Sequence, residues 1–429
     1  MRRKRFVFFL SAFVIVFAGC SNSQQPTDVS VKPAEKPLDP VKIRVHQLGG
    51  YFTDQDFNEL IAEPVKKKYP HLTVEMDKTT EDLPELLSKG ESIDFLVTYH
   101  GRLTAYKDLG VYLDLLPLAK QYNFDLGRFD QGALDTIIAN SEKGELYALP
   151  YANNLNALYY NKDIFDKFGV PYPKDGMLWE DAIELAKKVT RKDNDIQYRG
   201  IEVDDLNRLL FPLSLNIIDQ KTDKVLVNSD PYKRAFDIGK QIYSIPGNEF
   251  IGGSPIDRFL KDKTVAMIPT INLFLRLRQT PDLNWDVAQF PSYKEKPDTY
   301  GMYDLHCMIP MAMSKNRDDQ MRVLEVLFSE EVQTVMSRKS AKLSVMKDPK
   351  FRQAFGQDLP ELKGKHIEGV FKSKSAAAPP NSNYYSKAYS LLTAEYTNAV
   401  KNVKDVNTAL RDAEEQIRQH IVTEKGKGN

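Results

Sequence analysis

The chain has 429 residues, with 59 basic and 59 acidic side chains and two cysteines. This charge balance argues against a nucleic-acid-binding protein, because such a protein needs a basic face to neutralise phosphates. With so few cysteines, folding has to depend on a large hydrophobic core, and a chain of this length can supply one.

The first residues have the pattern of an export signal. A basic cluster precedes a mostly apolar run, Phe6 to Ala18, which is too short to span a membrane. The ending Ala18-Gly19-Cys20 resembles a bacterial lipobox and predicts a signal peptide over residues 1–19, with lipidation of Cys20. Simple secretion without the lipid is the alternative. Cleavage before Cys20 would remove four basic and no acidic residues, so the exported chain would be slightly acidic.

The segments next to the two ends look unstructured. Residues 20–40 are rich in Pro, Ser, Gln and charge, which predicts a disordered tether. The lysine-rich residues 423–429 are expected to fray. No later apolar segment reaches 18 residues, so we expect a soluble body anchored only at its N-terminal end.

From residue 41 onward, strand and helix patterns alternate. Strands are predicted at residues 41–45, 72–76, 92–100, 145–149, 155–160, 264–268, 285–290 and 305–309. Helices are predicted at residues 54–69, 128–140, 161–168, 180–190, 230–243, 271–278, 317–339 and 384–420, the last with a break near residues 402–405. The alternation indicates βαβ units and mostly parallel sheets, in which ligands gather at the carboxyl ends of strands.

One long stretch of the chain, residues 146–190, carries a family resemblance. Its marks are Leu149-Pro150, Asn153-Asn154, the run ALYYNKD that ends at Asp163, the run FGVP that ends at Pro171, and Trp179. This stretch resembles the central signature of extracellular solute-binding proteins of the type 1 carbohydrate family. The segments FNELIAEPVKKKYPHLTVE, NSDPYKRAFDIGKQIYSIPGN and KDKTVAMIP extend the resemblance over nearly the whole chain. Members of the family are receptors of ATP-driven sugar importers and are lipoproteins in Gram-positive bacteria.

The resemblance implies a fold of the α/β class, periplasmic-binding-protein-like type II, with two α/β lobes, a hinge and a central ligand cleft. Lobe 1 would comprise residues 41–150 and 308–360, and lobe 2 residues 151–307 and 361–422. Crossing segments at Pro150–Asn154 and Tyr303–Cys307 would absorb the backbone changes of hinge motion.

Ligand-binding candidates follow from position at strand ends and in the crossing segments. A neutral polyhydroxylated ligand needs directional hydrogen-bonding groups for its hydroxyls and flat aromatic partners for its C–H faces. The candidates are Tyr51, Tyr99, His100, Asn153, Asn154, Asn272, Phe274, Tyr303, Asp304 and His306. For each of them, capping or loop hydrogen bonding is the alternative. The pair His306-Cys307 and the segment around Asn272 depart from the usual family pattern.

Other conspicuous residues favour structural roles. The run Asp193-Asn194-Asp195 lacks the glycine and terminal glutamate of a calcium loop, so a solvated turn is favoured over a metal site. Tyr384-Tyr385 is interpreted as a helix start rather than an iron-binding pair, and Cys307 as a buried small side chain.

We therefore expect a lipid-anchored, extracellular substrate-binding component of an ABC importer, held at the cell membrane by its N-terminal lipid. It would act as a monomer without enzymatic activity, cofactor, metal or nucleic acid, and would deliver a carbohydrate to the permease subunits. The alternatives are a binder of a polyamine, peptide or anion, a signalling or scaffolding lipoprotein, and a secreted glycosidase, which needs two carboxylates flanking the scissile bond. The carboxylates of Asp94 and Asp304 are compatible with a polyamine ligand.

Overall fold

The computed structural model describes residues 38–427. The predicted signal peptide, Cys20 and most of the predicted tether therefore lie outside the described residues. The chain from Pro40 onward forms one compact unit. Within residues 38–427, none of the helices has the length and apolar character that crossing a bilayer requires.

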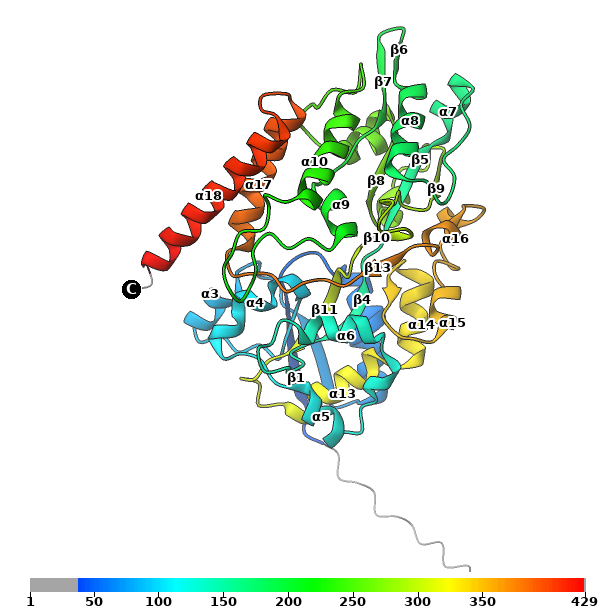
Figure 1. The fold of residues 1–429 in the computed structure, drawn as a ribbon. Coiled ribbons are helices and arrows are strands. Elements are labelled where there is room, and N and C mark those ends of the chain that lie inside the picture. The colour runs from blue at the N-terminus through cyan, green and yellow to red at the C-terminus, as the bar shows by residue number, and fades with distance from the viewer. Residues whose placement is uncertain (1–37, 428–429) are drawn as a thin grey trace, which may run out of the picture. The chain divides into compact units, whose positions relative to one another are not determined.

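A six-stranded sheet in the order β12-β4-β11-β3-β1-β2 is the centre of what we call the first lobe (Figure 1). Its strands are β1 (Val41–Gln47), β2 (Leu72–Met76), β3 (Phe95–Tyr99), β4 (Leu149–Asn153), β11 (Leu305–Pro310) and β12 (Leu343–Ser344). Along β1, the apolar side chains of Ile43 and Val45 alternate with Lys42 and Arg44, and both apolar side chains are fully buried. The alternation in the sequence therefore marks the face of β1 that enters the core.

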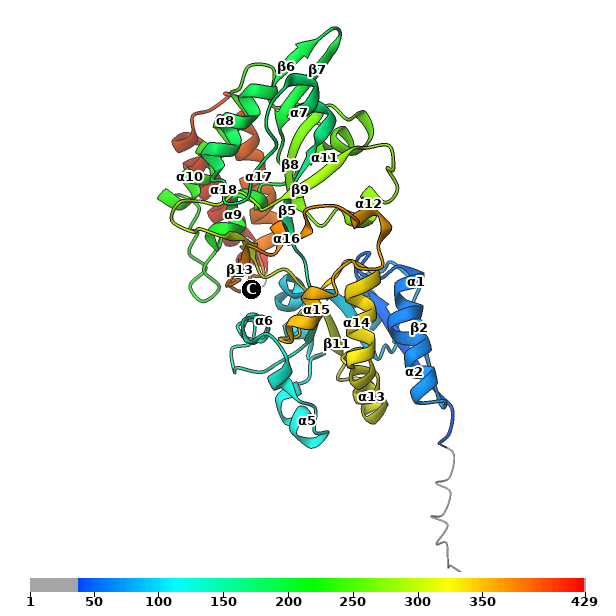
Figure 2. The ribbon, with the colours of Figure 1, turned by 90° about the vertical axis from the view of Figure 1, so that its right-hand side faces the viewer.

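Short helices surround this sheet. They are α1 (Asp54–Phe57), α2 (Glu63–Lys68), α3 (Leu83–Ser88), α4 (Leu103–Tyr106), α5 (Leu115–Gln121), α6 (Gln131–Ile138), α13 (Arg317–Leu327), α14 (Glu330–Lys339) and α15 (Pro349–Gln353). A π-helical turn at Asn58–Ala62 joins α1 to α2, and Figure 2 shows this pair beside α13 and α14. The predicted helix over 317–339 is two helices, because the Ser329 side chain accepts a hydrogen bond from the Val332 amide and starts α14.

A five-stranded sheet in the order β6-β7-β8-β5-β9 is the centre of the second lobe. Its strands are β5 (Asn156–Asn161), β6 (Arg191–Asp193), β7 (Ile196–Ile201), β8 (Val265–Ile271) and β9 (Trp285–Ala288). Its helices are α7 (Lys162–Phe168), α8 (Trp179–Val189), α9 (Asn207–Leu210), α10 (Asp230–Tyr243), α11 (Pro255–Asp257), α12 (Phe274–Leu277), α16 (Ile367–Val370), α17 (Tyr385–Val400) and α18 (Val406–Lys427). Figure 1 shows α17 and α18 side by side, next to α10.

The apolar run ALYY in the family signature belongs to β5, which is covered on both faces. Leu158 and Tyr160 point into the core formed with α8 and α10, whereas Ala157 and Tyr159 point into a separate core on the opposite face. A strand covered on both faces has to be apolar at every position, which explains why no polar residue interrupts the run. Asn161 then caps α7, and Gly169 ends that helix in the left-handed conformation with φ 62°.

Short segments around residues 154 and 304 connect the two lobes. Asn154 and Leu155 link β4 to β5, and Tyr303 and Asp304 link β10 (Thr299–Met302) to β11. β10 pairs with β13 (Lys374–Ala376), which belongs to the segment that leads on to α17. The sheets place Asn153 and Leu305 with the first lobe, although both fall inside the range predicted for lobe 2.

Two further details differ from the predicted division of the chain. Phe355 and Leu359, inside the range predicted for lobe 1, pack in the core on the outer face of β5 in the second lobe. The end of the chain is helical up to Lys427 rather than frayed, and Lys425 forms an ion pair with Asp223 at 2.7 Å. This contact holds the last turns of α18 against the second lobe.

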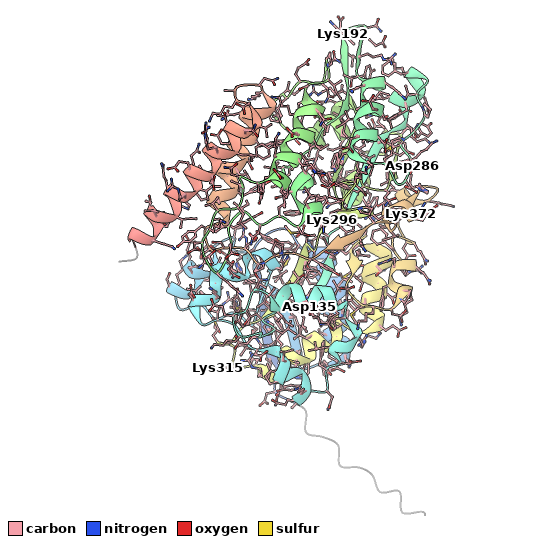
Figure 3. All side chains as sticks on the ribbon, viewed as in Figure 1. Asp135, Lys192, Asp286, Lys296, Lys315 and Lys372 are labelled. Carbon is pink, nitrogen blue, oxygen red and sulfur yellow. The ribbon has the colours of Figure 1, made fainter. Side chains whose placement is uncertain are left out.

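The prediction of mostly parallel sheets is wrong, because antiparallel pairs outnumber parallel pairs in the described sheets. β11 enters the first lobe from the second, at the edge where β3 and β4 end, so it has to run opposite to both. The run Asp193-Asn194-Asp195 forms the tight turn between β6 and β7, with Asn194 at φ 52°. Figure 3 shows the neighbouring Lys192 at the outer tip of this hairpin, which agrees with a solvated turn.

Candidate functional site

The candidate site is a cavity of about 740 Å³ that receives residues from both lobes and from the connections between them. We call it the cleft. It is lined by Gly49, Gly50, Tyr51, Tyr99, Asn154, Asp205, Asn207, Arg208, Phe211, Ile271, Asn272, Leu275, Arg276, Asp304, His306, Ser340, Lys342, Tyr385, Ser386 and Tyr389.

The sheet topology explains why these residues meet. In the first lobe, the loop that follows β1 carries Tyr51, and the neighbouring parallel strand β3 ends at Tyr99. In the second lobe, the segments that follow the parallel strands β7 and β8 carry Asp205 and Asn272. The carboxyl ends of parallel strands lie at one edge of a sheet, so the cleft lies where α/β sheets present their variable loops.

Asp304 is the central carboxylate of the cleft. Its Oδ2 accepts a hydrogen bond from Asn154 Nδ2 at 3.1 Å, and its backbone amide donates to Asn153 Oδ1 at 3.0 Å. No cation among the described residues forms an ion pair with it. Asp304 is therefore a fixed acceptor that still has lone pairs to offer.

Two histidines flank Asp304. The Leu305 amide donates to His100 Nδ1 at 3.2 Å, so this nitrogen is an acceptor and His100 is neutral. Burial lowers the pKa of both rings, that of His306 to about 4. His306 packs its ring against the edge of Tyr51, with 4.8 Å between ring centroids. Neutral histidines do not compensate the negative charge of Asp304 at neutral pH.

Aromatic rings form much of the remaining wall. Tyr51 and Tyr99 come from the first lobe, and Phe211, Tyr385 and Tyr389 from the second. Burial raises the pKa of Tyr51 to about 12, so its hydroxyl stays protonated and can donate a hydrogen bond. Tyr385 and Tyr389 stack with 5.9 Å between centroids, and the hydroxyl of Tyr389 donates to an oxygen of the cleft carboxylate Asp205 at 2.5 Å. Such rings offer flat faces and hydroxyl groups to the same ligand.

The cations of the cleft are already paired. Arg208 contacts Asp204 at 3.2 Å, Arg276 contacts Asp257 at 3.0 Å, and Lys342 contacts Asp56 at 3.1 Å.

Like Asp304, Asp205 forms no ion pair among residues 38–427. The charges left over in the cleft are thus negative. They disfavour an anionic ligand and suit hydroxyl or ammonium donors.

The structure brings together six of the ten predicted ligand-binding residues. Those in the cleft are Tyr51, Tyr99, Asn154, Asn272, Asp304 and His306. His100 lies behind Asp304 and is buried. Asn153 and Tyr303 line a second cavity instead. Phe274 is fully buried between Tyr159 and Trp285, where it cannot stack on a ligand.

Several cleft residues were missed by sequence reasoning. Asp205, Arg208 and Phe211 follow β7, and a prediction of that strand with a polar segment after it would have pointed to them. Tyr385 does begin a helix, as predicted, but the first turn of α17 also reaches the cleft together with Tyr389. Asp94, considered as a cleft residue, precedes β3 at the end away from the cleft and accepts hydrogen bonds from Ser314 and Asn316.

A family model described as bacterial extracellular solute-binding protein matches residues 50–250, which include the signature and the cleft residues Tyr51 and Tyr99. The chain belongs to this family. A protein of Brucella abortus strain 2308 that is named as a binding protein is 25% identical over 237 residues, which is 52% of this chain and 55% of the relative. The match thus spans about half the length of this curated relative.

Solved structures of this class resemble the solute-binding protein over most of its length. An ABC substrate-binding protein from Listeria monocytogenes, in complex with cycloalternan, has a TM-score of 0.73 at 18% identity and covers 89% of this chain and 99% of its own. A sugar transporter from Rhizobium etli in an open conformation has a TM-score of 0.72 at 17% identity, with 88% and 99% covered. The sugar-binding protein MalE from Xanthomonas citri has a TM-score of 0.71 at 17% identity, with 90% and 98% covered. The predicted fold, a type II periplasmic-binding-protein-like arrangement of two α/β lobes, is confirmed.

Among the described residues, no group of His, Cys, Asp and Glu side chains is arranged to hold a metal ion. Cys307 is a free, buried thiol, and burial raises its pKa well above the ordinary value. It behaves as the small apolar side chain that was predicted.

Proposed function

We propose that this solute-binding protein is the extracellular substrate-binding component of an ABC importer and that its ligand is a carbohydrate held in the cleft. The observation that carries the proposal is the pairing of unneutralised carboxylates with aromatic faces in one cavity. Asp205 and Asp304 can accept hydrogen bonds from sugar hydroxyls, and Tyr51 and Tyr99 can cover the C–H faces of a ring. The similar structures support a sugar, since they include a complex with cycloalternan and a sugar transporter.

Ligand capture would proceed by closure of the lobes. The cleft is lined from both lobes, so a ligand that contacts both walls favours the state in which they are closest. The connections at Asn154 and Asp304 are short and carry the hydrogen bond between these two side chains. They are suited to bend as one unit while each lobe stays rigid.

Delivery would occur at the membrane. In this proposal Cys20 carries the lipid, residues 20–40 form the tether, and the closed protein, acting as a monomer, docks on the permease subunits at the outer face of the cell membrane. Binding and release leave the ligand unchanged, so no enzymatic step is involved.

Isothermal titration calorimetry with a panel of mono- and oligosaccharides tests the proposal. We expect at least one carbohydrate to bind, and Asp304→Asn to weaken that binding by about tenfold or more, because it removes a charged acceptor. Asp135→Asn is the matched control, since Asp135 is exposed on α6 (Figure 3) and does not line the cleft. Absence of binding across the panel, or equal losses in both variants, would refute the carbohydrate proposal. Release of reducing ends would indicate a glycosidase instead.

A polyamine is the second candidate ligand. The specific observation in its favour is that Asp205 and Asp304 both lack cationic partners among the described residues, so the cleft could hold ammonium groups. Titration with spermidine separates the two candidates. Binding of spermidine that disappears in Asp304→Asn, without binding of any sugar, would favour the polyamine.

A further inference from the structure

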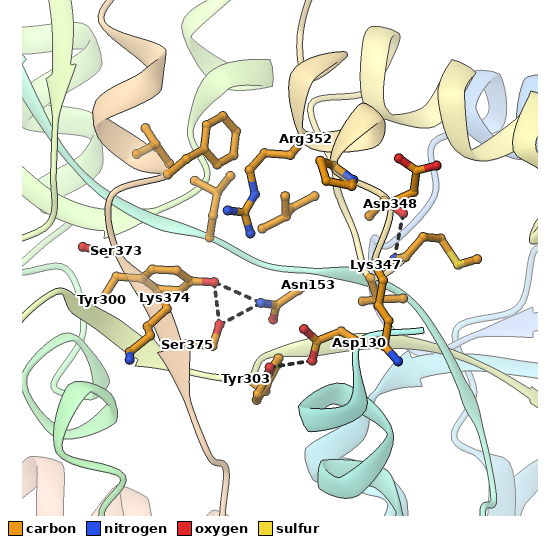
Figure 4. A pocket seen from close by; sticks show the side chains of 18 residues that line it. Asp130, Asn153, Tyr300, Tyr303, Lys347, Asp348, Arg352, Ser373, Lys374 and Ser375 are labelled. Atoms are coloured by element: carbon orange, nitrogen blue, oxygen red, sulfur yellow. Dashed lines mark hydrogen bonds between the residues drawn. The ribbon is translucent and has the colours of Figure 1, made fainter. Parts of the chain in front are cut away.

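A second cavity, of about 440 Å³, lies on the other side of the connection between the lobes (Figure 4). Asn153 lines this second cavity, whereas its neighbour Asn154 lines the cleft. Successive side chains of an extended chain point in opposite directions, so the connecting strand separates the two cavities. The ligand proposed for the cleft therefore leaves the second cavity unexplained.

A cluster of hydrogen-bonding groups forms one wall of the second cavity. Asn153 Nδ2 donates to the Tyr300 hydroxyl and to Ser375 Oγ, both at 2.9 Å, and the two hydroxyl oxygens are 2.6 Å apart. These hydroxyls carry two hydrogens, and the contact between them uses one. Within residues 38–427, the other hydrogen has only the Asn154 carbonyl oxygen at 3.5 Å as an acceptor, so it can be donated to a better acceptor in the cavity.

Three cations line the same cavity and come from separate segments. Lys347 follows β12, Arg352 lies on α15 and Lys374 begins β13. Within residues 38–427, none of the three forms an ion pair, whereas the neighbouring Lys350 and Lys372 do. In Figure 4 the guanidinium group of Arg352 points toward Tyr300 and Ser375, with Lys347 and Lys374 on the two sides of the cavity.

The acidic side chains of the cavity do not neutralise these cations. Asp130 accepts hydrogen bonds from the Tyr303 hydroxyl at 2.6 Å and from the Ala133 amide at 3.0 Å. Asp348 is paired with Lys350 at 3.0 Å. Burial raises the pKa of Tyr300 to about 12, and the positive charge of Arg352 opposes that rise. The guanidinium group is therefore close enough to interact electrostatically with the hydroxyl cluster. The second cavity thus has the opposite charge character to the cleft.

We propose that the second cavity binds a small phosphate-bearing anion, with Arg352 as its main ligand and Lys347, Lys374 and the hydroxyl cluster as further donors. A guanidinium group offers paired donors that match two oxygens of a phosphate, and the free hydroxyl hydrogen supplies a third contact. Inorganic phosphate and a small sugar phosphate share this chemistry, and a volume of about 440 Å³ can accommodate either. The three cations are exposed, so binding weakens as salt is added.

The position of the second cavity links it to the cleft. Arg352 belongs to a segment whose Phe351 packs in the first lobe, whereas Ser375 belongs to β13, which pairs with β10 in the second lobe. An anion held between these walls restricts the relative motion of the lobes. Any change it causes in the affinity of the cleft has to be reciprocal, so a cleft ligand changes the affinity for the anion by the same factor.

The test is calorimetric titration of the intact protein with sodium phosphate, and separately with glucose 6-phosphate and glucose, in a phosphate-free buffer of low ionic strength. We expect phosphate to bind, and Arg352→Gln to weaken binding by about tenfold, as for the loss of a charge-assisted hydrogen bond. Lys315→Gln is the matched control, because it removes one charge from an exposed lysine far from both cavities (Figure 3). Arg352 makes no side-chain hydrogen bond within the described chain, so its variant should fold, which circular dichroism checks.

The outcomes are distinct. Tighter binding of glucose 6-phosphate than of phosphate identifies a phosphorylated metabolite as the source of the anion, and equal binding identifies the free ion. Absence of binding by both overturns the proposal. Equal losses in Arg352→Gln and Lys315→Gln also overturn it, because they would reflect net charge only. Asp304→Asn serves as a second check, since an anion bound in the cleft would bind more tightly when this carboxylate is removed, and that result refutes the assignment to the second cavity.

Discussion

Replacement of Asn153 by alanine should destabilise the connection between the lobes rather than remove a ligand contact. The Asn153 side chain is 7% exposed and makes three hydrogen bonds, to Tyr300, to Ser375 and from the Asp304 amide. Each such bond contributes about 0.5–1.5 kcal/mol, and the groups left behind are partly buried. We therefore expect Asn153→Ala to lower the free energy of unfolding by about 2–4 kcal/mol.

The neighbouring residue supplies the matched control. Asn154 makes one side-chain hydrogen bond, to Asp304 at 3.1 Å, and faces the cleft. Asn154→Ala should therefore cost about 1 kcal/mol or less in stability, while it lowers the affinity for a cleft ligand directly. Urea denaturation followed by circular dichroism measures the first quantity, and calorimetry with a cleft ligand measures the second.

Two results would refute this reasoning about the two asparagines. One is a loss of stability in Asn153→Ala below about 1 kcal/mol, since that is less than one well-formed hydrogen bond contributes. The other is a loss of ligand affinity in Asn153→Ala as large as that in Asn154→Ala. A two-lobed protein can unfold in two steps, so the transition that changes should be followed by more than one probe.

Three further predictions follow from buried groups. Burial lowers the pKa of His306 to about 4, so as the pH falls below about 6.5 the unfolded state takes up a proton before the folded state does. The free energy of unfolding should therefore drop between pH 6.5 and 4, by on the order of 3 kcal/mol. A free energy of unfolding that stays constant over this pH range in urea denaturation would contradict this. Glu202→Gln should lower the free energy of unfolding by about 3–5 kcal/mol, because it leaves the buried Arg199 without its charged partner. Urea denaturation measures this free energy, and a loss of about 0.5 kcal/mol or less would argue against a buried ion pair. Gly200→Ala would place a methyl group 2.3 Å from a backbone carbonyl oxygen of α8 and should lower the melting temperature, whereas Gly252→Ala, with open space around it, should not.

Local features of the chain could be predicted because their signals are local. Asn161 caps α7 and Gly169 closes it, as the pattern of residue types indicates. The helix pair at the C-terminal end breaks where it was predicted to break, with Asn402 at φ 57° between α17 and α18. Each of these features depends on neighbours within one or two turns of the chain.

Sheet direction and the extent of the lobes were predicted less well. Whether a strand is parallel or antiparallel depends on the edge from which it enters, and β11 enters from the other lobe. A hydrophobic pattern reports that a strand is buried and carries no information on its direction. A hydrophobic residue likewise carries no information on which of two cores it joins, so Phe355 could not be assigned to the correct core from its position in the chain.

The sequence by itself determined the family, the alternation of strands and helices, and the group of polar and aromatic residues from which a binding site could be built. Only the tertiary structure decided that Asn153 and Asn154 face different cavities, that Phe274 is buried, and that Tyr385 reaches the cleft. The physical reason is that these contacts join distant segments. Asn154 and Asp304 are 150 residues apart in the chain, and their meeting depends on how two separately packed lobes are connected.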